Sequence, residues 1–273
     1  MKITNKLNLP SQFIQEEYHK PAENVYSVTE LLKSTKEIIL YRKYFDEVSV
    51  DVSDMVSTLF GTAVHNLLEK ATTSDVETEY SIEVDFEGVK IKGRCDVVDF
   101  KNLVIEDYKT CSTSKKDYED WKKQGLLYAL IIYLTKSIKI KKLRFYALMK
   151  DWSKVKAASN SSYPQNPIYI WEYDIEDSDY MYIMSWLRDK IEDIKNGIHD
   201  CSDEEKWYTG TKYAVYKNAG DKRAAYVTDN EKDAHNYINN KLDGVGEIEV
   251  RKGDNLKCLY YCNVSKFCEK GGN

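Results

Sequence analysis

The residues with the clearest chemical potential are two aspartates and a lysine: Asp96, Asp107 and Lys109. Both aspartates lie in stretches of alternating side chains that are typical of β-strands, and Lys101-Asn102 between them fits a tight turn. With a two-residue turn, Asp96 lies directly opposite Asp107; with a slightly longer turn, it becomes a diagonal neighbour. Either register brings the two carboxylates within reach of one ion, and Lys109 projects from the same strand face as Asp107.

Two neighbouring carboxylates repel each other and destabilise a sheet unless their charge is compensated. A divalent cation would remove that repulsion and keep both groups ionised. Such an ion can prepare a water for attack on a phosphate, and the Lys109 ammonium could orient that water or stabilise the developing charge. The alternative is a solvated surface ion pair, which acid-x-lysine triplets often form.

A histidine, His65, lies near the edge of an apolar helical stripe, with Gly61 one turn before it and Glu69 one turn after it. A glycine inside a helix costs about 1 kcal/mol relative to alanine, and close approach by a backbone or a substrate would explain it. His65 could ligate a metal or bind phosphate, and Glu69 could support it from a second layer. The alternative is a helix-edge histidine satisfied by water or a carbonyl.

A later helix carries Gln124 and Tyr128 on one face, because residues four apart stack on a helix. The glutamine could bond the lysine or a phosphate, and the tyrosine could contact a DNA strand; a half-buried amphipathic pair is the alternative. Nearby basic residues could track a phosphate backbone or form a solvated face. They are Lys115, Lys116, Lys122, Lys123, Lys136, Lys139, Lys141, Lys142 and Arg144.

The elements that must position these residues are predicted from periodicity and capping signals. The expected helices are 28–39 capped by Ser27, a helix from Ser53 to about 71, 115–134 and 178–197; the expected strands are 78–86, 89–99, 103–110, 143–150 and 167–174. Residues 1–26 read as irregular or partly helical. This order predicts an α/β fold with helices flanking a mixed central sheet. A β-β-α-β pattern between about 213 and 251 predicts a small β-rich appendage.

The composition suits one large domain with a small appended unit, since the chain has 273 residues of which 42% are hydrophobic. Its formal net charge of −5 excludes a generally basic nucleic-acid coat, so any DNA binding must come from a local patch and a metal. No apolar run is long enough for a signal peptide or a membrane span. We therefore expect a cytoplasmic protein without membrane association.

Four motifs, in order and spacing, resemble those of the PD-(D/E)XK nuclease superfamily, most closely its RecB-like exonuclease branch with phage-type exonucleases: Gly61…His65, Gly93…Asp96, Asp107-Tyr108-Lys109 and Gln124…Tyr128. The resemblance covers roughly residues 27–150. It implies a restriction-endonuclease-like core, which we place at 1–204. Residues 205–273 would then be a small α+β appendage whose cysteine-containing end returns to the core.

The same resemblance implies roles for the motif residues and a requirement for Mg²⁺ or Mn²⁺. The metal ligands would be His65, Asp96, Asp107 and the Tyr108 carbonyl. Lys109 would act on the water, while Gln124 and Tyr128 would complete the catalytic site and contact DNA. An acidic residue of the preceding strand sometimes contributes in relatives, and Glu79 and Glu83 are the candidates here.

Some relatives bind a [4Fe–4S] cluster through one cysteine before the histidine motif and three near the C-terminus. This chain has a similar terminal trio, Cys258, Cys262 and Cys268, but no cysteine before Cys95. A fourth ligand could come from His, Asp or another cysteine. Because the chain has no cysteine before the histidine motif, we expect unligated thiols rather than an iron–sulfur cluster or zinc.

The resemblance thus implies a metal-dependent exodeoxyribonuclease in phage-type recombination or DNA processing. Its expected partners are DNA and a single-strand-annealing recombination protein, and a homo-oligomer is compatible with the sequence. The alternative is a non-catalytic DNA-binding module on a nuclease fold. Intact Asp96, Asp107 and Lys109 argue against that alternative, because such a module has little reason to hold opposed carboxylates.

Overall fold

The computed structural model describes residues 1–14, 18–69, 76–115, 117–197 and 200–268. The chain forms two compact units, Met1–His199 and Asp200–Asn273. The expected boundary near residue 204 and the return of the cysteine-containing end to the core stay predictions. No helix within the described ranges is both long enough and apolar enough to cross a membrane.

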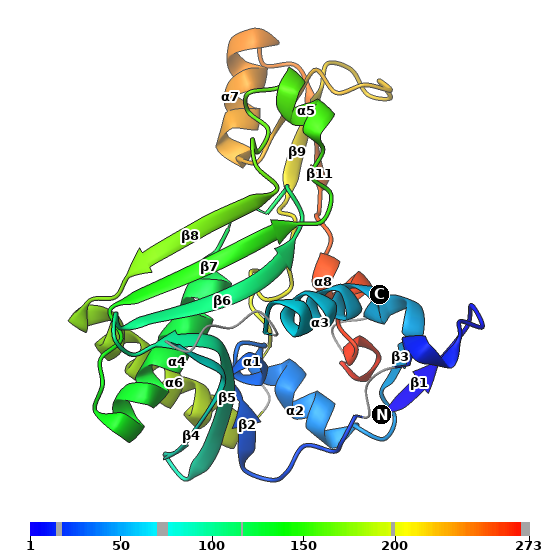
Figure 1. Cartoon of the computed structure of the whole chain (residues 1–273). Helices are drawn as coiled ribbons and strands as arrows, with labels where there is room; N and C mark the ends of the chain where they lie inside the picture. Colours follow the sequence, from blue (N-terminus) through cyan, green and yellow to red (C-terminus); the bar gives the residue numbers. More distant parts are fainter. Residues whose placement is uncertain (15–17, 70–75, 116, 198–199, 269–273) are drawn as a thin grey trace. The chain divides into compact units, whose positions relative to one another are not determined.

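The first unit is built on a six-stranded mixed sheet (Figure 1). Its strands run in the order β2-β5-β6-β7-β8, and β4 pairs with β5 as well. The pairs β2/β5 and β6/β7 are parallel, and the others are antiparallel. The bounds are β2 Val25–Ser27, β4 Glu77–Phe86, β5 Val89–Asp99, β6 Val104–Cys111, β7 Lys142–Met149 and β8 Ile168–Asp174. The predicted α/β fold with a restriction-endonuclease-like core is confirmed.

The helix α4, Glu119–Lys136, packs against one face of this sheet. It is apolar nearly all round, and its central leucines and isoleucines are fully buried, as expected of a helix enclosed by other elements. Its Trp121 stacks on Phe145 of β7. A Cβ at Gly125 would lie 2.6 Å from Leu143 Cδ1, so the glycine allows α4 to approach β7 closely. Behind α4 lies α6, Asp177–Asn196.

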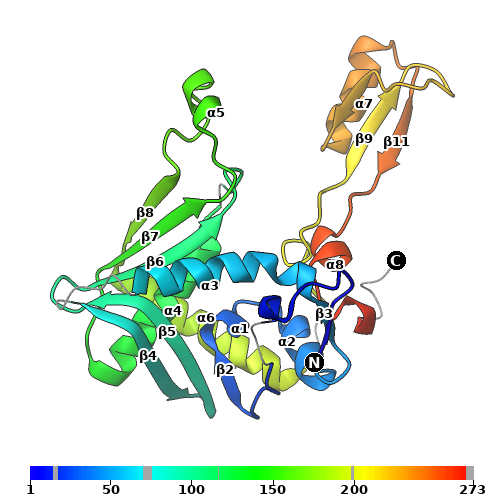
Figure 2. The ribbon, with the colours of Figure 1, turned by 45° about the vertical axis from the view of Figure 1, so that its right-hand side comes forward.

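The helix α3, Val56–Glu69, contacts β6 (Figure 2). A Cβ at its Gly61 would meet Thr110 Oγ1 at 3.9 Å, an ordinary contact, and His65 meets the ring of Tyr108 edge-on. Side chains alternate along a strand, so α3 lies over the face with Tyr108 and Thr110, opposite the face that Asp107 shares with α4. No close backbone approach therefore explains Gly61.

Several expected element boundaries were wrong near the N-terminus. The predicted helix 28–39 is two helices, α1 Val28–Leu31 and α2 Thr35–Lys43, because Ser34 supplies a second N-cap by accepting a hydrogen bond from the Glu37 amide. Asp51, rather than Ser53, caps the short 3₁₀ helix η2, Val52–Met55, that leads into α3. The first 26 residues are not merely irregular. They hold η1 Ser11–Phe13, the start of β2, and β1 Lys2–Thr4, which pairs with β3 Ser49–Asp51.

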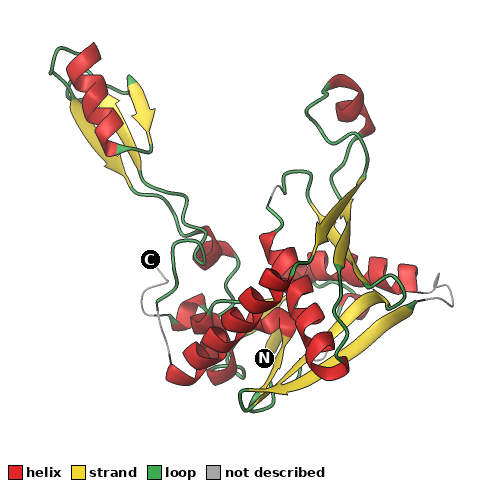
Figure 3. Cartoon of the chain, turned by 90° about the vertical axis from the view of Figure 1, so that its left-hand side faces the viewer, coloured by secondary structure: helices red, strands yellow, loops and turns green. Residues whose placement is uncertain are grey.

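The second unit contains a three-stranded sheet of order β10-β9-β11 covered by α7 (Figure 3). The predicted β-rich appendage is confirmed. The bounds are β9 Lys212–Tyr216, β10 Tyr226–Thr228, α7 Glu231–Lys241, β11 Glu247–Arg251, α8 Leu256–Tyr260 and η3 Ser265–Phe267; the short helix α5, Lys154–Ser159, belongs to the first unit. The hydrophobic core of the second unit is small, with Val215, Ala234 and Ile238 buried together.

Candidate active site

The site forms where the sheet divides around β5. On one edge of β5, β2 pairs with residues 90–92 and β6 pairs with residues 97–99. The segment between them, Gly93 to Asp96, has no strand partner on that edge among the described pairs. Two strands that pair with the same edge of β5 and then diverge leave an opening in the sheet, and Asp96 lies at this opening.

Of the two registers considered for the hairpin of β5 and β6, the structure has the one expected for a two-residue turn, since Val98 pairs with Ile105 and Asp99 with Val104. The ladder stops at Val97 and Glu106, one pair before the two aspartates. Beyond that point the Asp96 side chain replaces the missing strand contact, because its Oδ2 accepts a hydrogen bond from the Tyr108 amide at 2.6 Å. Asp96 is thereby fixed beside β6.

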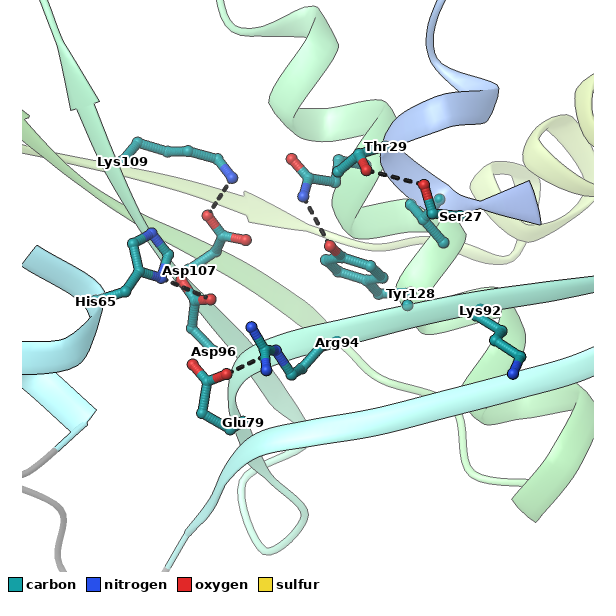
Figure 4. Close-up of a pocket in the computed structure, with 13 residues that line it drawn as sticks. Ser27, Thr29, His65, Glu79, Lys92, Arg94, Asp96, Asp107, Lys109 and Tyr128 are labelled. Carbon is teal, nitrogen blue, oxygen red and sulfur yellow. Dashed lines mark hydrogen bonds and ion pairs between the residues drawn. The ribbon is translucent and has the colours of Figure 1, made fainter. Parts of the chain in front are cut away.

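The imidazole of His65 reaches Asp96 from α3, with Nδ1 3.1 Å from Asp96 Oδ1 (Figure 4). The hydrogen bond to Asp96 raises the pKa of His65 above its ordinary value, although partial burial opposes the shift. If Nδ1 carries the proton of this bond, Nε2 is left as an acceptor that can bind a cation.

A third acidic group, Glu79 on β4, completes a trio of side chains that could hold a cation. Ligand atoms of His65, Glu79 and Asp96 all lie within 4.8 Å of one another. Glu79 has a left-handed backbone with φ 47° and sits between the pairs Thr78–Val97 and Tyr80–Cys95, which places it opposite Asp96. Such a conformation costs a non-glycine residue about 1–3 kcal/mol and is concentrated at functional positions.

The structure separates the two acidic candidates of β4. Glu83 forms ion pairs with Lys90 at 3.3 Å and Lys92 at 3.7 Å, and its side chain is 57% exposed. Glu79 is instead 21% exposed and pairs with Arg94 at 2.7 Å. Glu79 is therefore the residue of this strand that faces the site.

Asp107 is the most deeply buried charged group of the site, with a 3% exposed residue surface. Lys109 Nζ lies 2.5 Å from its Oδ2, yet none of the described donors is aligned to hydrogen-bond that oxygen. Burial raises the pKa of Asp107 to about 6, against the opposing effect of the Lys109 ammonium. A buried carboxylate oxygen with only an ion-pair neighbour is a group that a further cation would stabilise.

Gln124 and Tyr128 lie side by side on α4, as predicted, and the amide Nε2 donates to the tyrosine hydroxyl at 2.8 Å. Both are buried, and burial raises the pKa of Tyr128 far above its ordinary range. The Gln124 amide therefore bonds Tyr128 and not Lys109. The pair forms a neutral wall beside the charged residues.

One cavity of about 510 Å³ gathers these groups (Figure 4). All the predicted motif side chains except Tyr108 line it, and Lys92, Arg94, Ser27 and Thr29 are added. Sequence reasoning gave Lys92 and Arg94 no role, although alternation along β5 places Arg94 on the same face as Asp96. The ring of Tyr108 packs between His65 and Tyr146. The side chain of Glu69 lies outside the described residues.

The expected basic track is largely neutralised by carboxylates of the same unit. Lys115 pairs with Asp120, and Lys122 lies 3.7 Å from Asp179. Arg144 bonds Glu106 and Glu172, both at 2.6 Å. Lys139 and Lys142 also have acidic partners, while Lys116 falls outside the described residues. Lys92 and Arg94 line the cavity itself, and they too have acidic partners, Glu83 and Glu79.

A family model described as the PD-(D/E)XK nuclease superfamily matches residues 19–269. The crystal structure of SSO0001 aligns at 20% identity over 64% of this chain and 78% of that chain, with a TM-score of 0.45. An alkaline exonuclease (LHK-Exo) from Laribacter hongkongensis aligns at 10% identity over 63% of this chain and 92% of that chain, with a TM-score of 0.35. No curated protein matches the sequence.

Proposed function

Because the chain belongs to the PD-(D/E)XK nuclease superfamily, we propose that it is a divalent-metal-dependent deoxyribonuclease of the RecB-like, phage-exonuclease type. One observation carries the proposal. The sheet opening at Gly93–Asp96 gathers three carboxylates, an imidazole and a lysine around one cavity. Titratable groups gathered around one cavity in this way are typical of a functional site.

The residues present fit Mg²⁺ or Mn²⁺. Both ions prefer oxygen ligands, and manganese also accepts imidazole. The trio His65, Glu79 and Asp96 would hold the ion, and Asp107, whose buried Oδ2 accepts no hydrogen bond from the described donors, lines the same cavity. Glu79 is thereby added to the ligands that the motifs predicted. A bound divalent ion would neutralise phosphate charge and lower the pKa of a water that attacks phosphorus.

Lys109 is the group placed to act on the reacting atoms. Its ammonium is held at Asp107, with a side chain 20% exposed toward the cavity. From there it can donate a hydrogen bond to the attacking water or to a phosphate oxygen as charge develops. Asp107 acts as its positioning partner, because an ion pair at 2.5 Å restricts the long lysine side chain.

The DNA strand would be held by the remaining cavity residues. Lys92 and Arg94 can bind phosphates flanking the scissile bond, and Arg94 can exchange its Glu79 contact for a phosphate. The buried Gln124–Tyr128 pair offers a neutral surface against a sugar or base. We extend the proposal to exonucleolytic digestion in phage-type recombination or DNA processing in the cytoplasm. The proposed partners are a single-strand-annealing protein and further copies of this chain.

The test is cleavage of end-labelled linear DNA, duplex and single-stranded, by the full-length chain with Mg²⁺, Mn²⁺ or a chelator. We expect metal-dependent release of short products. Asp107→Asn should abolish this release. Asp85→Asn, which changes an exposed carboxylate of β4, should leave it intact. If the folded wild-type chain cleaves neither substrate in either metal, while it binds DNA as well as Asp107→Asn does, the chain is the alternative, a non-catalytic DNA-binding module.

A further inference from the structure

Glu79 is the most adjustable of the three residues that could hold the ion. Both carboxylate oxygens of Asp96 have partners on neighbouring elements, the Tyr108 amide at 2.6 Å and His65 Nδ1 at 3.1 Å. Glu79 is instead held by a long side chain, since its Oε2 lies 2.7 Å from Arg94 Nε (Figure 4). The Arg94 side chain is 68% exposed, so the contact that holds Glu79 is within reach of ligands.

The strand register places Glu79 between a like charge and an opposite charge. The residues on either side of Glu79 pair with the residues on either side of Asp96, so the two acids lie opposite each other. Arg94, two residues before Asp96, projects from the same face of β5. Like charges that lie opposite each other on neighbouring strands repel, and a nearby cation relieves that repulsion. Arg94 thus balances the charge that Glu79 adds beside Asp96.

The guanidinium of Arg94 and a divalent ion would stabilise the same carboxylate. An ion held by His65, Glu79 and Asp96 would supply the positive charge that Arg94 supplies to Glu79, and it would repel the guanidinium. The contact between Arg94 and Glu79 must therefore weaken when the ion binds. Among the residues that the structure describes, no other acidic side chain pairs with Arg94, so its N–H donors would then be available to a phosphate.

We propose that Arg94 couples metal binding to DNA binding, an inference that rests on the metal-dependent nuclease function proposed above. Arg94 pairs with Glu79 until the ion takes over that carboxylate, and the released guanidinium then binds a phosphate of the DNA strand. Because both ligands act through one equilibrium, each raises the affinity for the other by the same factor. The site therefore binds DNA most tightly when its metal is in place.

Lys92 provides the matched comparison for Arg94. It lines the same cavity from the same strand, two residues before Arg94, and its side chain is 54% exposed. Its acidic partner at 3.7 Å is Glu83, which does not line the cavity. Lys92 can thus contribute a phosphate contact without competing for a carboxylate that would hold the ion. Its loss should weaken DNA binding equally with and without metal.

The first experiment titrates Mn²⁺ into the full-length chain without DNA, by calorimetry. Arg94→Ala should bind Mn²⁺ about threefold or more tightly than the wild type, because the ion no longer displaces a guanidinium from Glu79. Lys92→Ala, which removes one positive charge from the same cavity, should stay close to the wild type. Equal or weaker Mn²⁺ binding by a folded Arg94→Ala chain overturns the proposal, because Arg94 would then hold Glu79 in place for the ion.

The second experiment measures the affinity for an end-labelled DNA duplex in the presence of a chelator. Glu79→Gln should bind the duplex about threefold or more tightly than the wild type, because Arg94 loses its acidic partner and can contact a phosphate. Most of this gain should be lost when Glu79→Gln is combined with Arg94→Ala, in a double-mutant cycle. Equal gains with and without the Arg94 side chain overturn the proposal.

The third experiment repeats the DNA titration with saturating Mn²⁺ in chains that carry Asp107→Asn to prevent cleavage. Mn²⁺ should raise the DNA affinity about fivefold or more, and Arg94→Ala should lower that factor at least about threefold, whereas Lys92→Ala should leave it unchanged. A factor that Arg94→Ala does not change overturns the proposal.

The double-mutant cycle in chelator needs neither metal nor cleavage, so it separates this proposal from the nuclease assignment. A chain that cuts no DNA but shows the cycle would keep the exchange of Arg94 between Glu79 and phosphate and lose the nuclease assignment. A chain that cuts DNA without any coupling through Arg94 would lose only the role of Arg94.

Discussion

Gly93 of β5 lies directly against the ring of Tyr128 of α4. A Cβ at Gly93 would stand 2.8 Å from Tyr128 Cε1, closer than real Cβ atoms come to a neighbour, and a tight 3.1 Å from Val28 Cγ2. The Tyr128 ring thus requires a glycine at position 93 of the Gly-x-x-Asp motif. The ring contacts β5 within the segment, Gly93 to Asp96, that has no strand partner on that edge. Two motifs that are distant in sequence are one packing unit.

Gly93→Ala should therefore displace Tyr128 and break its bond with Gln124. Overpacking of this kind costs about 1–3 kcal/mol of folding free energy, and we expect cleavage to fall at least about tenfold in a chain that still folds. Thermal unfolding and cleavage rate measure the two effects. Gly61→Ala is the matched control, since its Cβ meets only Thr110 at 3.9 Å and should raise helix stability by up to about 1 kcal/mol. Equal tolerance of both substitutions would contradict the packing argument.

Asp107→Asn should separate stability from activity. Burial raises the folded-state pKa of Asp107 to about 6, above the unfolded value of about 3.9, so ionisation of Asp107 lowers stability as pH rises through that window. At pH 7.5 without metal, the variant should be at least as stable as the wild type, whereas cleavage should fall about a thousandfold or more. Thermal unfolding and cleavage are measured on the same preparation. Strong destabilisation would instead assign Asp107 a structural role.

Glu79→Gln and Glu83→Gln form a matched pair on one strand. Glu79 lines the cavity with His65 and Asp96, whereas Glu83 does not line it and pairs with Lys90 and Lys92. Glu79→Gln should weaken Mn²⁺ binding and the metal dependence of cleavage about 10–100-fold, and Glu83→Gln should leave both near wild type. Calorimetric titration of Mn²⁺ into each protein gives the comparison. Similar affinities for both variants would remove Glu79 from the ligand set.

Asp51, which caps the 3₁₀ helix η2 that leads into α3, should contribute to the stability of the chain. Hydrogen bonds from Ser53 and Thr4 hold the pKa of Asp51 well below its ordinary value. A depressed folded-state pKa gives stability that is present above the unfolded value, about 3.9, and is lost as pH falls below it. Asp51→Asn should thus lower the melting temperature at pH 7, and the difference from wild type should shrink below about pH 4. Exposed Asp54→Asn is the control, and a difference that does not change with pH would argue against the carboxylate as the cause.

Much of the fold could be predicted from the sequence, because local patterns sufficed for it. Alternation and the turn position narrowed the pairing of β5 with β6 to two registers, of which one is observed, and periodicity predicted α4 and α6 to within a few residues. The split between α1 and α2 was missed because Ser34 acts as a cap only in competition with a continuing helix. The choice of Glu79 over Glu83 was open for a different reason, since it depends on a left-handed residue that no local pattern signals.

By itself, the sequence determined which groups could do chemistry, since motif order and strand periodicity are written along the chain. Tertiary structure alone decided where the sheet opens. The opening exists because β2 and β6 pair with different stretches of the same edge of β5 and leave a gap between them. The same holds for the contact between Gly93 and Tyr128. Contacts between residues far apart in the chain arise from packing and long-range hydrogen bonds, which no short stretch of sequence contains.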